Sequence, residues 1–330
     1  MKKNMLRALA LALALMLTAT GCGAGTTAAP EETPQVFSQE VPLEATDIED
    51  EMVALAAAPA IPNAMMPVAS GTAVQKTDKA EIDYSNVADG YVMVRYTAST
   101  SKKLKAQVKG PSGETYTYTI TPSKEWTTFP LSDGNGSYKV TVFENVSGNS
   151  YATVTSVTVT AALKDAFGPF LLPNQYVNYK PESKVVAKAQ ELVGKKSEML
   201  DKVAGVYDYV VNNFTYDKAK AGSVQSGYVP KVDNVLAQKK GICFDYAAVM
   251  AAMLRSQGVP TKLVVGFSGK VYHAWINVYS EETGWIDGVI QFDGKSWKLM
   301  DPTFASSAKK SKEIMSYIGN GANYSAKYIY

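Results

Sequence analysis

One cysteine, one histidine and one aspartate in the second half of the chain have the chemistry of a nucleophilic active site. Cys243 opens an apolar stretch, His273 lies in the segment YHAW, and Asp301 lies in LMDPTF. His273 is the only histidine of the chain, and the second cysteine, Cys22, lies near the N-terminus. In a thiol-based triad the imidazole accepts the thiol proton, and a carboxylate orients the imidazole. These three residues are therefore the candidates for acyl-transfer chemistry.

A helix over residues 243–257 is expected to position the cysteine. Its apolar residues recur at helical spacing, and Gly258 and Pro260 follow where a helix end is expected. Cys243 then lies in the first turn, where unpaired N–H groups and the positive end of the helix dipole stabilise a thiolate. Asp245 is expected to cap this helix. The alternative is a buried, inert cysteine, but Cys243 precedes the apolar residues and follows a glycine turn.

Strands are expected to position the histidine and the aspartate. Residues 261–267 indicate a buried strand, residues 273–279 alternate between polar and apolar side chains, and residues 297–300 indicate a strand that ends at Asp301. Neighbouring antiparallel strands would place His273 beside Asp301 and against the start of the Cys243 helix. Taken singly, a strand histidine is often structural and an aspartate before proline often forms a turn.

The combined motifs over residues 181–303 resemble the transglutaminase-like superfamily. They are Gly-x-Cys at the start of a helix, Arg-x-x-Gly-Val-Pro at its end, then His-Ala-Trp and Asp-Pro-Thr, in that order. The resemblance implies an α+β, papain-like catalytic domain in which a cysteine on a helix packs against a sheet that carries histidine and aspartate. It implies that Cys243 is the nucleophile, that His273 is the base and that Asp301 orients the imidazole.

The oxyanion of such a reaction needs hydrogen-bond donors, and the main-chain N–H of Cys243 is one candidate. Tyr216, in FTYD, lies where many bacterial relatives carry a tyrosine and is the second candidate. Gln225 and Gln238 are competing donors. No calcium-binding loop is visible, so we expect neither a metal nor a cofactor. Arg255 and Lys262 are expected to face solvent or to form local pairs.

Composition limits the possible classes of function. The 330 residues are 46% hydrophobic and 19% charged, which is ordinary for a globular protein, and the net charge of +2 gives no electrostatic case for nucleic acid as a partner. A single cysteine outside the N-terminal segment excludes an intrachain disulfide framework. One cysteine and one histidine also cannot supply the usual four ligands of a structural zinc site.

The N-terminal segment has the pattern of an export signal. Residues 1–22 combine a basic start, an apolar stretch and small residues before Cys22. The segment resembles a bacterial lipoprotein signal, with Ala19 where leucine is usual, and it implies lipidation of Cys22 and an extracytoplasmic location at the cell membrane. A plain secretory signal and an N-terminal membrane anchor are the alternatives. Residues 23–75, rich in Ala, Thr, Pro and acidic residues, are expected to form a disordered tether.

Residues 76–163 are expected to form an all-β, immunoglobulin-like sandwich. Short runs rich in Val, Thr and Tyr alternate there with turn sequences such as GPSGE and SDGNGS. No cluster of catalytic residues occurs in this region, which favours a spacer or targeting module, and Trp126 is expected in its core. Residues 164–330 are assigned to the catalytic domain, with helices over 181–194 and 199–211, a loop over 218–234 and a C-terminal tail whose tyrosines pack on the domain.

The sequence therefore predicts a surface-anchored thiol enzyme that acts on peptide or glutamine amide bonds of a protein or peptide, such as a cell-wall peptide. The acyl-thioenzyme would be resolved by water in a hydrolase or by an amine in a transglutaminase, and the triad does not distinguish the two. The alternative is a non-catalytic surface lipoprotein that binds peptide or cell-wall polymer, which the sandwich and the long tether would suit.

Overall fold

The structure is a computed structural model that describes residues 65–280, 284–286, 290–292, 297–299 and 324–330. The chain divides into two compact units, Met1–Thr33 and Pro34–Tyr330, and all of the described residues belong to the second. The predicted signal with Cys22, most of the predicted tether, and Asp301 lie outside the described residues. Within the described part, no helix combines the length and the apolar character that a membrane crossing requires.

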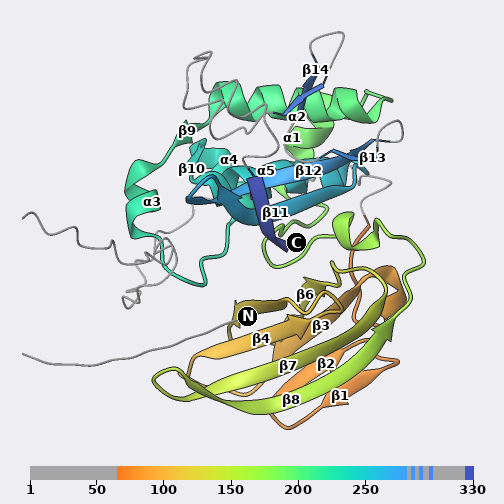
Figure 1. Ribbon diagram of the computed structural model, residues 1–330, viewed down its shortest axis with the longest axis vertical. Coiled ribbons are helices and arrows are strands. Elements are labelled where there is room, and N and C mark those ends of the chain that lie inside the picture. Colours follow the sequence, from red (N-terminus) through yellow and green to blue (C-terminus); the bar gives the residue numbers. More distant parts are fainter. Residues whose placement is uncertain (1–64, 281–283, 287–289, 293–296, 300–323) are drawn as a thin grey trace, which may run out of the picture. The chain divides into compact units, whose positions relative to one another are not determined.

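Eight strands between residues 74 and 161 form two four-stranded antiparallel sheets (Figure 1). The first sheet has the order β1-β2-β3-β6, and the second has the order β5-β4-β7-β8. The strands are β1 (Val74–Lys76), β2 (Ala80–Asp83), β3 (Tyr91–Tyr96), β4 (Leu104–Lys109), β5 (Thr115–Ile120), β6 (Thr127–Pro130), β7 (Gly136–Ser147) and β8 (Ser150–Ala161). A 3-10 turn, η1 (Val87–Asp89), precedes β3.

Alternation along the strands builds the core of this region. In β4 the buried side chains are Leu104, Ala106 and Val108, and the side chains between them are at least partly exposed. Buried residues of both sheets belong to one hydrophobic cluster, so the two sheets face each other across a shared core. Trp126 is half-buried: it packs against a small buried cluster of Tyr91, Met93 and Leu172, and the Arg95 guanidinium lies 4.4 Å from its ring centroid, so its predicted place in the core is confirmed only in part.

The described residues after β8 combine helices with a four-stranded sheet of order β13-β12-β11-β16. A 3-10 turn, η2 (Gly168–Phe170), precedes the helices α1 (Lys184–Val193), α2 (Met199–Asn213), α3 (Lys218–Ser223), α4 (Val232–Gln238) and α5 (Cys243–Ser256). The sheet strands are β11 (Thr261–Ser268), β12 (Val271–Ser280), β13 (Gly284–Ile286) and β16 (Tyr324–Ile329). Two short pairs are β9 (Thr215–Tyr216) with β10 (Lys240–Gly241), and β14 (Ile290–Phe292) with β15 (Trp297–Leu299).

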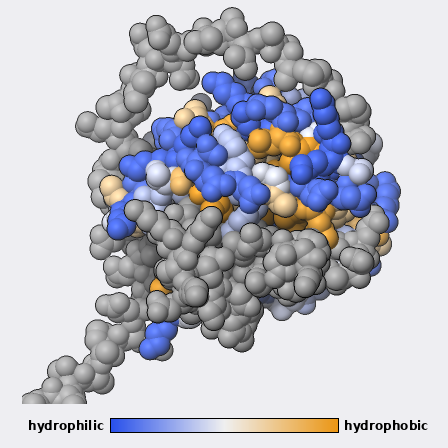
Figure 2. Space-filling model, turned by 90° about the horizontal axis from the view of Figure 1, so that it is seen from above, coloured by the Kyte–Doolittle hydropathy of each residue, from blue (hydrophilic) through white to orange (hydrophobic). Residues whose placement is uncertain are grey.

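Helix α5 is the centre of this part of the chain. Every residue from Phe244 to Ser256 is buried, because strands β11 and β12 lie against the helix and α1, α2 and α4 also pack on it. Gly258 ends it with φ at +77°, the left-handed conformation that favours glycine. Helix α5 thus begins and ends where the sequence predicts. Figure 2 shows one face of the molecule, where a largely hydrophilic surface is interrupted by a hydrophobic area.

Two local predictions are wrong. The predicted loop over residues 218–234 contains α3 and the start of α4. Arg255 is completely buried and does not face solvent. The predicted packing of the C-terminal tyrosines is confirmed for residues 324–330: Tyr324 contacts the Trp275 ring, Tyr330 is buried, and strand β16 pairs with β11.

Arg255 is completely buried and holds three segments together. Its guanidinium donates to the main-chain oxygens of Thr261 at 2.9 Å, Leu172 at 2.7 Å and Tyr330 at 2.6 Å. Burial lowers the pKa of Arg255 to about 10, so the group remains charged near neutral pH. Arg255, which the sequence suggests is a polar residue at a helix end, therefore fixes the positions of the connection to α1, the start of β11 and the C-terminal strand.

Candidate active site

Cys243 is the first residue of α5 and is half-buried, so the thiol is not sealed inside the core. Asp245 lies two residues further along the helix and accepts a hydrogen bond from the Ile242 N–H, with 2.9 Å between nitrogen and Oδ2. This bond satisfies one of the N–H groups that a helix start leaves open. The predicted capping role of Asp245 is thereby confirmed. The nucleophile candidate lies in the helix turn that this cap fixes.

The turn that leads to Cys243 is held beside Tyr216. Strands β9 and β10 pair in parallel, and the register places Gly241 opposite Tyr216. The Asp217 N–H donates to the Gly241 carbonyl oxygen at 2.8 Å, which closes this pairing. Gly241 is required by close approach, because a Cβ there would lie 2.6 Å from the Cβ of Asp245. Tyr216, which is half-buried, therefore lies next to the segment that carries the thiol.

A polar cluster surrounds the Asp245 carboxylate, which is completely buried. The Lys220 ammonium lies 2.7 Å from its Oδ2, and the Tyr228 hydroxyl donates to its Oδ1 at 2.5 Å. Burial, together with the adjacent Asp245 carboxylate, raises the pKa of Tyr228 well above its ordinary value. Lys220 on α3 and Tyr228 after it thus neutralise and hold the carboxylate at the start of α5. Neither residue lies in a motif, so neither could be identified from the sequence.

His273 lies on β12 opposite Gly266 of β11 and is buried. Its ring is nearly parallel to that of Trp275, at 23° with centroids 6.4 Å apart, and the Trp275 indole N–H donates to Asn277 Oδ1 at 3.0 Å. Along β12 these three residues alternate with Ala274, Ile276 and Val278, which belong to the hydrophobic cluster that includes α5. The alternation of this strand and the structural role of Trp275 agree with the sequence prediction.

Helix α5 packs against strand β12. Burial raises the pKa of Tyr272, the residue before His273, to about 12, and electrostatic interactions with Tyr328 and Cys243 add to that increase. The structure therefore packs the helix that begins at Cys243 against the strand that carries His273.

The other predicted site residues have separate outcomes. Gln238 is exposed at the end of α4, and the Gln225 amide donates to the Ser223 carbonyl oxygen at 2.8 Å. Asp301 lies outside the described residues, so its pairing with His273 stays a prediction. Among the residues that the structure describes, no three His, Cys, Asp or Glu side chains form a group that could hold a metal ion.

Comparison with known proteins gives a match to one family. Residues 186–288 match the family described as the transglutaminase-like superfamily. This region of the chain contains most of α1, the helices α2 to α5 and the strands β9 to β13, including Cys243 and His273. The matched region is therefore transglutaminase-like, with mixed helices and strands.

Individual relatives match part of the chain. An uncharacterized protein of Bacillus subtilis, YebA, is 30% identical over 118 residues, which are 30% of this chain and 16% of that protein. Among solved structures, the periplasmic domain of TgpA from Pseudomonas aeruginosa is 17% identical, with 72% of this chain and 77% of that one covered and a TM-score of 0.33. Red sea bream transglutaminase is 12% identical, with 64% and 48% covered and a TM-score of 0.27. TM-scores this low identify neither a shared fold nor a shared function.

Proposed function

We propose that this chain, whose residues 186–288 belong to the transglutaminase-like superfamily, is a thiol acyl-transfer enzyme that acts on amide bonds of proteins or peptides. Cys243 is the nucleophile, His273 the base, and Asp301 the residue that orients the imidazole. The observation that carries the proposal is the position of Cys243: it is partly exposed at the start of the buried central helix, and that helix packs against the strand with the only histidine.

The reaction follows from these groups. The His273 imidazole takes the thiol proton, and the Cys243 sulfur attacks the amide carbonyl carbon, which gives a tetrahedral oxyanion. The imidazolium then protonates the leaving amine, and an acyl-thioenzyme remains. Water or a second amine attacks this thioester, regenerates the thiol, and gives a hydrolysed or an amine-transferred product. Helix α5 favours the thiolate because Cys243 is its first residue, at the end where the unpaired N–H groups and the positive end of the helix dipole lie.

Two groups are proposed to stabilise the oxyanion. One is the main-chain N–H of Cys243, which lies in the first turn of α5 and so has no partner four residues earlier within the helix. The other is the hydroxyl of Tyr216. The strand pairing supports this role: Tyr216 lies opposite Gly241, and Gly241 is two residues before Cys243 in the chain. Gln238, the last residue of α4, is a weaker candidate because it is exposed.

The chain is further proposed to be extracytoplasmic, with Cys22 lipidated and residues 23–75 as a tether that links the folded part to a bacterial cell membrane. The signal-like pattern of residues 1–22 supports this location. We infer that residues 76–163 form an immunoglobulin-like domain and residues 164–330 the catalytic domain. Two antiparallel sheets of orders β1-β2-β3-β6 and β5-β4-β7-β8 that share one hydrophobic core support the sandwich class.

A labelling experiment tests the enzyme proposal. The purified chain would be treated with a thiol-reactive peptide amide probe, alongside the variants Cys243→Ala and His273→Ala. We expect labelling of the wild type, no labelling of Cys243→Ala and strongly reduced labelling of His273→Ala. Equal labelling of the wild type and Cys243→Ala would remove the enzyme proposal and favour the non-catalytic binding protein.

A second experiment identifies the acceptor. The chain would be incubated with a glutamine-containing peptide library, with and without a primary amine, and the products read by mass spectrometry. Deamidation, backbone cleavage and amine incorporation each change the peptide mass by a different amount. We expect products whose formation requires Cys243; cleavage or deamidation would identify a hydrolase, and amine incorporation a transglutaminase.

A further inference from the structure

The outward face of the second sheet carries an ordered array of polar side chains. Strand pairing arranges twelve residues in three rows across the strands in the order β5, β4, β7, β8. The rows are Thr115, Lys109, Lys139, Thr158; then Thr117, Gln107, Thr141, Ser156; then Thr119, Lys105, Phe143, Thr153. We name this array the outer face. Eight of its side chains are hydroxyl or amide groups, three are lysines, one is aromatic, and none is acidic.

The lysines of the outer face are arranged unfavourably for a surface without a ligand. Lys109 and Lys139 are exposed and directly opposite each other on neighbouring strands. Like charges in that arrangement repel and weaken strand pairing. In the part of the chain that the structure describes, neither ammonium has an acidic partner within ion-pair distance. An anion bound between the two would remove this repulsion.

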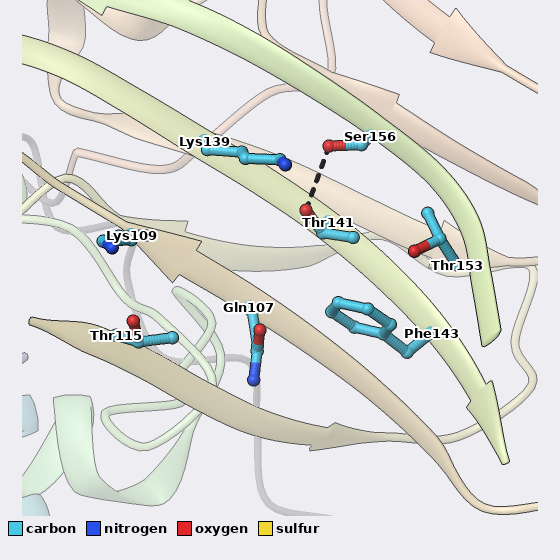
Figure 3. Close-up of a pocket in the computed structure, with 8 residues that line it drawn as sticks. All are labelled: Gln107, Lys109, Thr115, Lys139, Thr141, Phe143, Thr153 and Ser156. Atoms are coloured by element: carbon cyan, nitrogen blue, oxygen red, sulfur yellow. Dashed lines mark hydrogen bonds between the residues drawn. The ribbon is translucent and has the colours of Figure 1, made fainter. Parts of the chain in front are cut away.

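The outer face is also hollowed. A shallow cavity of about 350 Å³ lies over it, lined by eight of the twelve residues, which Figure 3 shows on four neighbouring strands. The half-buried Phe143 ring belongs to the lining of this cavity, as do Lys109 and Lys139. Hydrogen bonds already order part of the lining: Thr141 and Ser156 hydroxyls are 3.0 Å apart, and the Gln107 amide donates to Thr117 Oγ1 at 3.1 Å. The cavity is therefore preformed, with hydroxyl, amide and ammonium groups on its floor.

We propose that the outer face binds an acidic polysaccharide, a linear sugar chain that carries carboxylates. The lysines pair with the carboxylates, while the threonine, serine and glutamine side chains exchange hydrogen bonds with sugar hydroxyls, and the Phe143 ring packs on an apolar sugar face. A protein partner would need a larger apolar centre than one half-buried phenylalanine offers. A nucleic acid would be expected to meet more cations than three lysines, and arginine among them.

Binding would be measured by affinity electrophoresis of the full chain in detergent. The gels would contain polygalacturonate, uncharged dextran or inorganic polyphosphate, each at several salt concentrations. We expect polygalacturonate to slow the wild-type chain, with an effect that weakens as salt rises, and dextran to leave its mobility unchanged. The variant Lys109→Gln/Lys139→Gln is expected to bind polygalacturonate about tenfold more weakly.

Two further variants separate a sugar site from charge alone. Lys124→Gln/Lys180→Gln removes two exposed lysines outside the outer face, so it has the same net charge as the first variant and is expected to bind like the wild type. Phe143→Ala and Gln107→Ala keep the net charge and are expected to weaken polygalacturonate binding but not polyphosphate binding. Circular dichroism would verify that each variant is folded.

Three results would overturn the proposal. The first is unchanged mobility of the wild type in polygalacturonate. The second is equal loss of binding in the two double-lysine variants. The third is polyphosphate binding as strong as polygalacturonate binding with no effect of Phe143→Ala or Gln107→Ala, which would identify a general attraction of polyanions.

Discussion

The ammonium of Lys220 lies 2.7 Å from a carboxylate oxygen of Asp245, a residue with no solvent exposure. Asp245 is two residues from Cys243 on the same helix, so its charge acts on the thiol as well as on the helix cap. A buried carboxylate without a partner is strongly destabilising, and it disfavours a second negative charge nearby. Lys220 therefore stabilises the cap and, on the proposed function, also keeps the surroundings of Cys243 suited to a thiolate.

Lys220→Met is expected to slow the alkylation of Cys243. The variant leaves the Asp245 carboxylate without its cation, and the repulsion between that charge and a forming thiolate lowers the thiolate population at a given pH. We expect the rate of iodoacetamide reaction at pH 6 to fall about threefold to tenfold. The rate would be measured by mass spectrometry of the intact chain as a function of pH.

Two matched variants test the cause of that change. Lys218→Met removes a neighbouring exposed lysine of α3 and is expected to leave the alkylation rate unchanged. Lys220→Met/Asp245→Asn removes both charges and is expected to restore most of the lost rate. If the double variant reacts as slowly as Lys220→Met, the charge argument is wrong and the loss of rate reflects a distorted helix start.

Tyr216→Phe is expected to lower turnover without changing thiol reactivity. Loss of one oxyanion donor reduces kcat about a hundredfold in comparable acyl-transfer sites. Alkylation of Cys243 forms no oxyanion, so its rate should equal that of the wild type. Tyr209→Phe, on α2, is the control. Normal turnover of Tyr216→Phe on the peptide substrate would exclude Tyr216 as the donor and leave Gln225 as the remaining candidate.

Arg255→Met is expected to destabilise the chain by about 3–5 kcal/mol. The change leaves three buried main-chain oxygens without their donor, and each such loss costs about 1–3 kcal/mol, part of which the structure can recover by relaxation. Urea unfolding followed by circular dichroism would measure the free energy of unfolding. Arg95→Met breaks an ion pair between the partly buried Arg95 and Glu81, but Glu81 keeps Lys76 as a second partner, so the expected cost is smaller, about 1–2 kcal/mol. Equal effects of the two variants would contradict the anchoring role of Arg255.

Local patterns predicted much of the fold because they report directly on burial. The helix that starts at Cys243 has an apolar repeat with a glycine and a proline after it, and the strand at His273 alternates strictly, so both could be located from the sequence. The pairing of β16 with β11 could not be predicted, because a run of six mixed residues does not indicate which strand it will join. Helix α3 is six residues long and too polar to show a repeat.

The site was predictable only as far as motifs extend. Cys243 and His273 stand in recognisable segments, whereas Lys220 and Tyr228 meet Asp245 through the folding of a segment without a motif. Arg255 was misassigned for the same reason: a charge near a helix end usually faces water, and only the packing of three distant segments around it makes its burial possible.

Stability should fall in acid through Glu144. The side chains of Lys102, Tyr96 and Lys79 donate hydrogen bonds to this carboxylate and lower its pKa to about 2 from an ordinary value of 4.5. Because the folded pKa is the lower one, the stabilisation is complete above about pH 5 and is lost progressively between pH 5 and pH 2. Thermal unfolding of the wild type and Glu144→Gln should differ at pH 6 and converge towards pH 2. Glu114→Gln, at an exposed turn, is the control and should show no such convergence, and a constant difference between the wild type and Glu144→Gln across this range would refute the assignment.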